Sequence, residues 1–499
     1  MSRQASGGNV KSDAPVADSP DAVRNVLLVG AAGSGKTTLV ETLLVSAGVL
    51  NRAGTTAEGT TVCDFDEAEH RQQRSVGLAL APLIHGGVKI NLLDAPGYVD
   101  FVGELRAGLR ASDCALFVIA ANEGIDEPTR SLWRECAQVS MPRVVVITKL
   151  DHARADYDGV VARAQDAFGD EVLPVYLRDG DQLVGLITGE HGHAEDRGAL
   201  IEGIIEESED EALMERYVGG EEIDPKLLVE DLERAVARGS FYPVVPVDSS
   251  NRVGAVELLD LIVSGFPSPL SHPMPEVFTP VGKVGPELRC DPAGPLVAEV
   301  VKTTTDPYVG RVSLVRVFSG TVRPDATVHV SGHLSAFTDV ARGTGHQDHD
   351  EDERIGTLSV PLGKTQRFTS KVVAGDICAI GRLSRAETGD TLSETAHPLL
   401  LKPWVMPEPL LPLAIQARAK ADEDKLVQAL QRLAAEDPTL RIENNAETHQ
   451  IVLWTMGRRT PTCSSTGSRT ATGCPSTRWR CGCRCGRRST SQRWVTAGT

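Results

Sequence analysis

The chain has 499 residues, of which 41% are hydrophobic, and a formal net charge of −17. This length suits about three domains with ordinary hydrophobic cores. Residues 458–499 hold nine Arg and no acidic residue, so the first 457 residues carry 42 basic against 68 acidic side chains. Because this part of the chain is so acidic, general binding to DNA is excluded, and any contact with RNA has to be local. No stretch is apolar enough to be a transmembrane helix.

The first residues and the cysteines indicate the compartment. Residues 1–20 are rich in Ser, Gly, Asp and Ala and lack the apolar segment of a secretory signal, so we expect a disordered arm. Five cysteines are scattered singly through the body, as in reduced cytosolic proteins. They are Cys63, Cys114, Cys136, Cys290 and Cys378. We therefore expect a cytoplasmic protein.

A glycine-rich segment between a predicted strand and a predicted helix is the strongest motif of the chain. The strand is the apolar run Val26–Val29, and residues 38–44 place apolar side chains at helical spacing. The segment reads G-x-x-x-x-G-K-[ST] and consists of Gly30, Ala31, Ala32, Gly33, Ser34, Gly35, Lys36 and Thr37. In such a loop, backbone N–H groups and the positive end of a helix dipole point at one phosphate position. Lys36 adds a positive charge for the β and γ phosphates, and the Thr37 hydroxyl suits a Mg²⁺ ligand. We include Thr38, the next helical residue, in this site. The alternative, a glycine-rich turn that binds nothing, does not account for the flanking strand and helix.

Polar motifs also follow later apolar runs of strand length. The runs are Val88–Leu93, Ala115–Ala120, Val144–Ile147 and Val244–Val247. Three of them are followed by Asp94, Ala95, Pro96 and Gly97, by Thr148, Lys149, Leu150 and Asp151, and by Asp248, Ser249 and Ser250. Apolar strands that alternate with helical stretches predict a parallel, doubly wound α/β sheet, which binds ligands at the carboxyl ends of its strands. Asp94 suits the Mg²⁺ side of that site, and the Gly97 N–H suits a sensor of the γ-phosphate.

These ordered motifs resemble those of a translational GTPase. Later segments resemble the second domain of elongation factor G, a β-barrel, and then its third domain. The first set is Gly294–Leu296, Lys302–Thr303, Asp306–Arg311, Arg316–Thr321 and Ala374–Ile377, and the second is Met406–Pro409, Lys420–Asp422, Asp424–Leu426 and Glu436–Thr439. The resemblance extends from about residue 24 to 457. It implies GTP or GDP with Mg²⁺ as cofactors, and a monomer that contacts rRNA and proteins of the ribosome but neither DNA nor a membrane.

The resemblance also implies the domain organisation. We expect a P-loop GTPase domain at 21–275 with an insertion at about 155–240, a β-barrel domain at 276–405 and a partial ferredoxin-like α+β domain at 406–457. The residues themselves agree, because 296–380 shows short β-rich runs separated by turn residues. Residues 422–435 place Leu426, Ala429, Leu430 and Leu433 on one helical face, which we interpret as core rather than as a partner surface.

The guanine motif and the switch segment depart from the family. Thr148 stands where the family has Asn, and we expect weaker affinity for the base. Asp151 remains, and its carboxylate can accept two hydrogen bonds that guanine offers and adenine does not, which favours GTP over ATP. In the switch segment Gly54–Val76, an ungapped match makes Ser75 a Mg²⁺ ligand beside Thr37 and Asp94. A shift of register would put Gly77 there and remove the ligand.

Tyr98 is the third departure, because the family carries a His that orients the attacking water after Asp-x-Pro-Gly. A phenol with a pKa near 10 is no general base at neutral pH. We take Lys36, Gly97 and Tyr98 as the catalytic set and expect slow hydrolysis. The favoured function is a GTP-hydrolysing translation factor that resembles elongation factor G. The alternatives are a regulatory or ribosome-protection factor that binds GTP without translocating, and a non-functional fragment.

The segment 458–499 does not continue the resemblance. Its residues Cys481, Cys483 and Cys485 lack the paired C-x-x-C spacing of a structural zinc site. Codons read one base out of register across 458–468 permit Glu-Ala-His-Ala-Asp-Val-Leu-Leu-Asp-Arg-Leu, a string that resembles the family's next helix. We therefore expect a one-base frameshift after Gly457, a disordered tail, and a third domain that stops after a β-α-β-β unit with an open strand edge.

Overall fold

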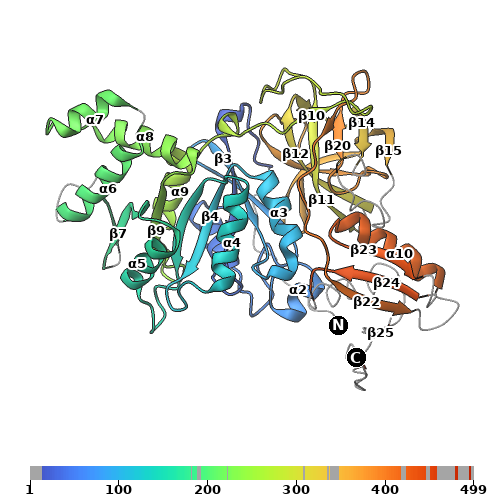
Figure 1. Ribbon diagram of the computed structural model, residues 1–499, viewed down its shortest axis with the longest axis horizontal. Helices are drawn as coiled ribbons and strands as arrows, with labels where there is room; N and C mark the ends of the chain where they lie inside the picture. The colour runs from blue at the N-terminus through green and yellow to red at the C-terminus, as the bar shows by residue number, and fades with distance from the viewer. Residues whose placement is uncertain are drawn as a thin grey trace.

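The computed structural model describes most of the chain in three consecutive parts (Figure 1). The described residues are 14–180, 182–187, 193–208, 210–221, 223–306, 310–333, 337, 348–416, 423–445, 450–457, 478–480 and 494–495. Part of the expected N-terminal arm is among them. Pro15, Ala17 and Pro20 are buried, and Asp18 forms an ion pair with Lys371 at 2.7 Å, so residues 14–20 are ordered against the body of the protein.

A seven-stranded sheet in the order β2-β3-β1-β4-β5-β9-β6 forms the first part. Its strands are β1 (Val23–Val29), β2 (Ala79–His85), β3 (Val88–Asp94), β4 (Cys114–Ala120), β5 (Arg143–Thr148), β6 (Val172–Pro174) and β9 (Tyr242–Pro246). The edge strand β2 is antiparallel to β3, and the other neighbours are parallel. The parallel sheet predicted from the apolar runs is confirmed, with β2 and β6 as two strands that were not predicted.

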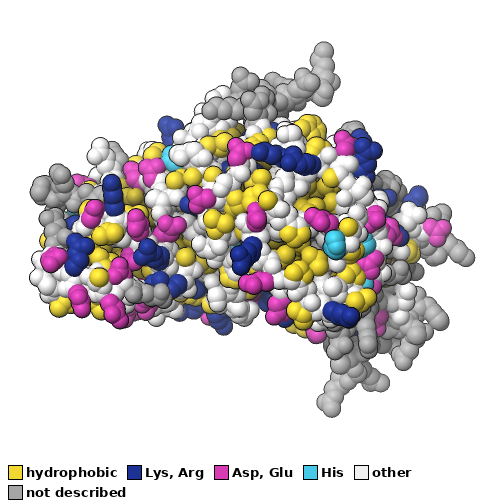
Figure 2. All heavy atoms as spheres, turned by 90° about the horizontal axis from the view of Figure 1, so that it is seen from above, with side chains coloured by type: hydrophobic (Ala, Val, Ile, Leu, Met, Phe, Trp, Pro, Cys, Tyr) yellow, Lys and Arg dark blue, Asp and Glu magenta, His cyan; other side chains and the backbone are white. Residues whose placement is uncertain are grey.

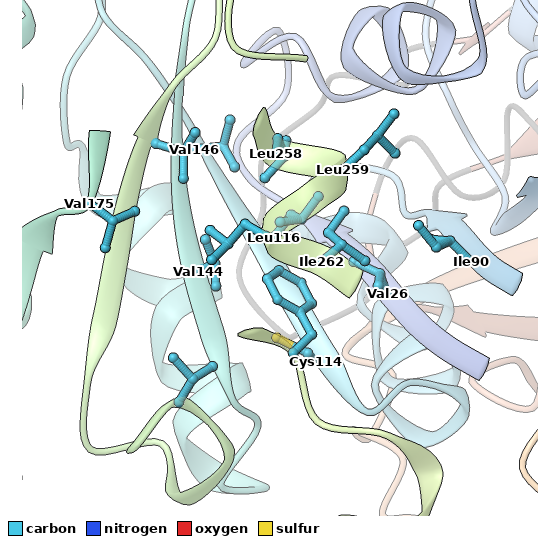
Figure 3. Close-up of a cluster of buried hydrophobic side chains, with 14 of the residues drawn as sticks. Val26, Ile90, Cys114, Leu116, Val144, Val146, Val175, Leu258, Leu259 and Ile262 are labelled. Carbon is cyan, nitrogen blue, oxygen red and sulfur yellow. The ribbon is translucent and has the colours of Figure 1, made fainter. Parts of the chain in front are cut away.

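Helices cover both faces of this sheet, because its central strands are apolar on both sides. α1 (Lys36–Ser46) and α9 (Ala255–Gly265) share one core with the sheet, and α3 (Val102–Ala111), α4 (Glu127–Gln138) and α5 (Tyr157–Phe168) share the other. Figure 3 shows the α9 side chains Leu258, Leu259 and Ile262 beside residues of β1, β3, β4 and β5. The remaining short helices are α2 (Glu67–Gln72), η1 (Pro20–Ala22), η2 (Val99–Phe101) and η3 (Pro269–Ser271).

The acidic stretch between α5 and β9 lies at one end of the first part, on the side away from the second and third parts (Figure 1). It contains the hairpin β7 (Tyr176–Asp179) and β8 (Gln182–Gly185), and the helices α6 (Ala194–Glu206), α7 (Glu211–Val218) and α8 (Pro225–Arg238). Asp210 and Asp224 accept backbone N–H groups at the starts of α7 and α8. On the face shown in Figure 2, acidic and basic side chains are interspersed. None of the described helices is long and apolar enough to span a bilayer.

An antiparallel sheet of eight strands, in the order β15-β14-β20-β11-β12-β19-β16-β17, dominates the second part. Its strands are β11 (Val297–Asp306), β12 (Gly310–Ser319), β14 (Thr327–Gly332), β15 (His349–Arg354), β16 (Thr357–Leu362), β17 (Thr365–Phe368), β19 (Ile377–Gly381) and β20 (Thr391–Ser393). Two smaller sheets pair β10 (Val277–Phe278) with β21 (Leu400–Leu401) and β13 (Thr321–Val322) with β18 (Val372–Val373). Six of the eight strands contribute to one apolar core, which agrees with the β-barrel prediction.

Buried ion pairs join the second part to the amino ends of the first part's strands. Lys89 on β3 bonds Asp376 at 2.8 Å, and Asp113 beside β4 bonds Arg316 at 2.8 Å. All four side chains are at most 2% exposed. Breaking such a pair leaves an uncompensated buried charge, which typically costs about 3–5 kcal/mol. These contacts therefore fix the second part at the edge of the sheet opposite the phosphate loop.

The third part has the predicted β-α-β-β order: β22 (Leu411–Gln416), α10 (Glu423–Glu436), β23 (Arg441–Asn445) and β24 (Gln450–Thr455). Leu426 and Leu430 are buried with Leu453 of β24, so the interpretation of the α10 face as core is confirmed. The expectation of an open edge is wrong for β22, because β25 (Arg478–Arg480) pairs along it and β26 (Trp494–Val495) pairs with β25. The rest of 458–499, with Cys481, Cys483 and Cys485, lies outside the described residues.

Candidate functional site

The carboxyl ends of the central strands meet at one edge of the first sheet. Leu28 of β1 pairs with Asp94 of β3, and Ala120 of β4 pairs with Thr148 of β5. The next strand, β9, ends beside β5 at Pro246. The loops that follow β1, β3, β5 and β9 therefore gather at this edge, as the sequence predicted for a ligand site.

The glycine-rich loop leads directly into α1. Gly33 and Gly35 have φ angles of +85° and +95°, which side chains disfavour. Gly30 lies so close to β4 that an added Cβ would be 2.4 Å from the Val118 carbonyl oxygen. No side chain caps the start of α1, so its first N–H groups point into the loop. This geometry is that of an anion-binding loop.

Lys36 lies buried inside this loop. Its Nζ donates hydrogen bonds to the carbonyl oxygens of Gly30 at 2.7 Å and Ala31 at 3.2 Å. Burial lowers the pKa of Lys36 to about 8, and the nearby Asp94 carboxylate opposes this shift. The ammonium group is therefore still mostly charged at pH 7 and can attract a phosphate.

The three residues chosen as Mg²⁺ ligands lie together. The Thr37 hydroxyl donates to Asp94 Oδ2 at 2.6 Å and lies 3.2 Å from the Ser75 hydroxyl. Gly77, the alternative in the shifted register, instead packs against Lys302. Burial raises the pKa of Asp94 to about 6, although Lys36 opposes this shift. The structure thus favours the ungapped register.

Asp64 is a further buried carboxylate at this place, which sequence reasoning missed. It is 4% exposed, and its Oδ1 has no hydrogen-bond partner, as is also true of Asp94 Oδ1. Burial raises the pKa of Asp64, while the neighbouring Ser75 hydroxyl opposes this shift. The only signal in the sequence was its place in an acidic run before α2.

The donor set fits a hard divalent cation. Two unpartnered carboxylate oxygens and two hydroxyl groups suit Mg²⁺, which is commonly held by one or two carboxylates together with substrate phosphates. Within the described part of the chain, no group of three or more His, Cys, Asp or Glu side chains is placed to hold a metal ion.

The turn after β3 touches the phosphate loop through its backbone. An added Cβ at Gly97 would lie 2.6 Å from both Ala32 N and Gly30 O, so only glycine fits there. The next residue, Tyr98, lies under the guanidinium of Arg74, which is 5.1 Å from the centroid of the phenol ring. Because Arg74 precedes Ser75, this cation–π contact joins the segments on either side of the site.

The Thr148 side chain lies at the carboxyl end of β5, against the phosphate loop. Its hydroxyl is buried, donates to the Ser34 carbonyl at 2.6 Å and lies 3.3 Å from Ile119 O. Thr148 is thus a brace between β5 and the phosphate loop. The expectation of weaker affinity for the base stays a prediction.

Asp151 lies at the outer end of the site with the loop after β9. Its Oδ2 accepts a hydrogen bond from the Ser250 hydroxyl at 2.6 Å. Asp248 is buried and accepts the Ser250 and Asn251 N–H groups, so it shapes this loop rather than facing a ligand. Lys149 pairs with Glu123 at 3.2 Å.

The remaining predicted residues lie around these groups and differ in their exposure. Half-buried are Ala31, Ala32, Leu150 and Ser249, buried are Ser34, Ala95 and Pro96, and exposed is Thr38.

Comparison with known proteins gives the family of this arrangement. Residues 21–268 match the Elongation factor Tu GTP binding domain, 310–393 match Elongation factor Tu domain 2, and 406–459 match Elongation Factor G, domain III. Curated proteins called elongation factor G-like protein, from two strains of Mycobacterium tuberculosis, are 68% identical over 463 residues. The chain belongs to the elongation factor G-like translational GTPases. The resemblance stated from the sequence is therefore confirmed.

These relatives are longer than this chain. The alignment covers 89% of this chain and 65% of the Mycobacterium tuberculosis proteins. A solved protein of Thermus thermophilus has a TM-score of 0.74 at 29% identity, over 90% of this chain and 66% of that one. The comparisons thus establish the family and the fold of the three described parts.

Proposed function

We propose that this chain binds GTP and GDP together with Mg²⁺ at the edge of the first sheet and hydrolyses GTP slowly. One observation carries the proposal: Lys36, Thr37, Asp94 and Asp151 all lie at the edge where the strands end, and Ser75 of the switch segment lies beside Thr37. Asp151 selects guanine, because its carboxylate can accept both the N1–H and the N2 amino group.

Lys36 and the N–H groups at the start of α1 bind the phosphates in this proposal. Thr37, Ser75 and Asp94, with Asp64 behind them, would hold Mg²⁺, which neutralises charge on the phosphates. The Gly97 N–H donates toward the γ-phosphate position. Phosphoryl transfer depends mainly on positioning and electrostatics, so a misplaced water reduces the rate more than the affinity.

Tyr98 makes hydrolysis slow in this proposal. A phenol does not accept a proton from water at neutral pH, and the contact with Arg74 orients its ring toward the switch segment. We further propose that the protein acts at the ribosome through local contacts, as its family implies. The second candidate function is a GTP-binding regulatory or ribosome-protection factor without translocation, which slow hydrolysis at Tyr98 favours.

Single-turnover hydrolysis tests this proposal. Tyr98→His should accelerate GTP cleavage by part of the roughly 10²- to 10⁴-fold that positioned acid–base groups contribute, with little change in GTP affinity. The rate should be measured with and without ribosomes, for the unsubstituted chain and for the variant. Rapid hydrolysis by the Tyr98 form that is unchanged by the substitution would show that another group positions the water.

A further inference from the structure

Lys302 of the second part contacts the end of the switch segment in the first part. Its Nζ donates to the Leu78 carbonyl at 3.1 Å and to Glu104 Oε2 at 2.9 Å. The same Glu104 oxygen accepts the Leu78 N–H at 2.6 Å. Lys302 and Glu104 are 16% and 22% exposed, so both charges are largely shielded from water. The backbone of Leu78 is thus held on both sides by one ion pair.

The chain between Ser75 and Leu78 is held as well. Glu69, which is 4% exposed, accepts the N–H groups of Val76 at 3.1 Å and Gly77 at 3.4 Å. Each N–H group from Val76 to Leu78 therefore bonds to a carboxylate. Because Ser75 immediately precedes them, these bonds restrict where its hydroxyl can lie.

Two local features bring Lys302 to this point. The pairing of β11 with β12 shifts register between Val300 and Lys302, and such a bulge redirects a side chain. On the other side, Gly77 leaves room for the ammonium group, because an added Cβ there would lie 2.5 Å from Lys302 Nζ. Figure 1 shows α3, which carries Glu104, facing β11 across the boundary between the two parts.

We propose that Lys302 is a positioning residue that holds Ser75 in its cation-binding place, so that the second part of the chain sets the affinity of the first part for GTP. This inference rests on the proposed function, because it assigns Ser75 to the Mg²⁺ of the triphosphate state. Glu104 lies on α3, which follows the turn at Gly97. The ion pair of Glu104 with Lys302 therefore joins both the switch segment and the Gly97 turn to the second part of the chain. GDP, which has no γ-phosphate for the switch segment to enclose, is bound without this help.

Hydrogen–deuterium exchange of the full chain tests the contact without any nucleotide. Lys302→Met should increase exchange at Val76–Leu78 by about tenfold, because a hydrogen bond to a charged group is lost. Gly77→Ala should have the same effect from the other side, since its methyl group displaces the ammonium and leaves all charges in place. The double variant should exchange no faster than either single variant, because both remove one interaction. Lys402→Met, which removes the exposed pair with Glu276, is the matched control.

Titration of the same variants with GTP and GDP analogues tests the link to Ser75. Lys302→Met and Gly77→Ala should weaken GTP binding by about tenfold and leave GDP binding unchanged. Unchanged exchange at Val76–Leu78 in Lys302→Met would overturn the contact, and faster exchange with an unchanged ratio of GTP to GDP affinity would overturn its role in positioning. Failure of the unsubstituted chain to bind either nucleotide would instead contradict the proposed function and, with it, the role given to Ser75.

Discussion

Removal of the Thr148 hydroxyl should weaken the binding of every nucleotide without changing the preference for a base. In Thr148→Ala the Ser34 carbonyl, now bonded at 2.6 Å, loses a buried donor. A buried polar group left without its partner costs about 1–3 kcal/mol. If the phosphate loop needs this brace to keep its shape, the loss corresponds to about 5- to 150-fold in affinity.

The assay compares GTP with ITP, which lacks the N2 amino group that Asp151 can read. Thr148→Ala should weaken both nucleotides by the same factor, whereas Asp151→Asn should change their ratio. Thr148→Ser keeps the hydroxyl and serves as the matched control. A change in the ratio of GTP to ITP affinity in Thr148→Ala, or no loss of affinity at all, would refute the assignment of Thr148 to the phosphate loop.

Two more substitutions test other contacts. Gly97→Ala places a methyl group 2.6 Å from backbone atoms of the phosphate loop, which costs about 1–3 kcal/mol in overpacking. In a titration, this substitution should lower GTP affinity more than GDP affinity. Gly198→Ala is the control, because nothing lies within 4 Å of an added Cβ there. Asp113 is a test of pH dependence, because burial raises its pKa to about 6, above the ordinary value of 3.8, although Arg316 opposes the shift. Protonation therefore favours the folded state, and this contribution to stability is lost as the pH rises through 6. The Tm advantage of the unsubstituted chain over Asp113→Asn should be larger at pH 5.5 than at pH 7.5, and an equal advantage at both would contradict the raised pKa.

The sequence predicts the central strands and their loops well because they depend on local patterns. Short apolar runs such as Val144–Ile147, which alternate with helical stretches, are typical of buried strands in a sheet covered on both faces, and the carboxyl end of this run predicts where Thr148 and Asp151 lie. The antiparallel strand β2 was missed because Pro82 interrupts its apolar run, and proline is tolerated there because β2 is an edge strand.

Other features depend on contacts between distant residues, which local patterns do not contain. The letter Thr at position 148 does not say whether its hydroxyl faces a base or the Ser34 carbonyl. Asp64 looks like one of several acids before α2, and its burial becomes visible only when the loops are folded together. Likewise, Lys302 is 224 residues from Leu78 in the chain.

Titration of the unsubstituted full chain with fluorescent GTP and ATP analogues, with and without Mg²⁺, tests the central claim most directly. The arrangement of Lys36, Thr37, Asp94 and Asp151 predicts Mg²⁺-dependent binding of GTP, much weaker binding of ATP, and loss of both in Lys36→Ala. Equal affinity for the two nucleotides would contradict the assignment of Asp151 to guanine, and GTP binding that persists in Lys36→Ala would contradict the phosphate site itself.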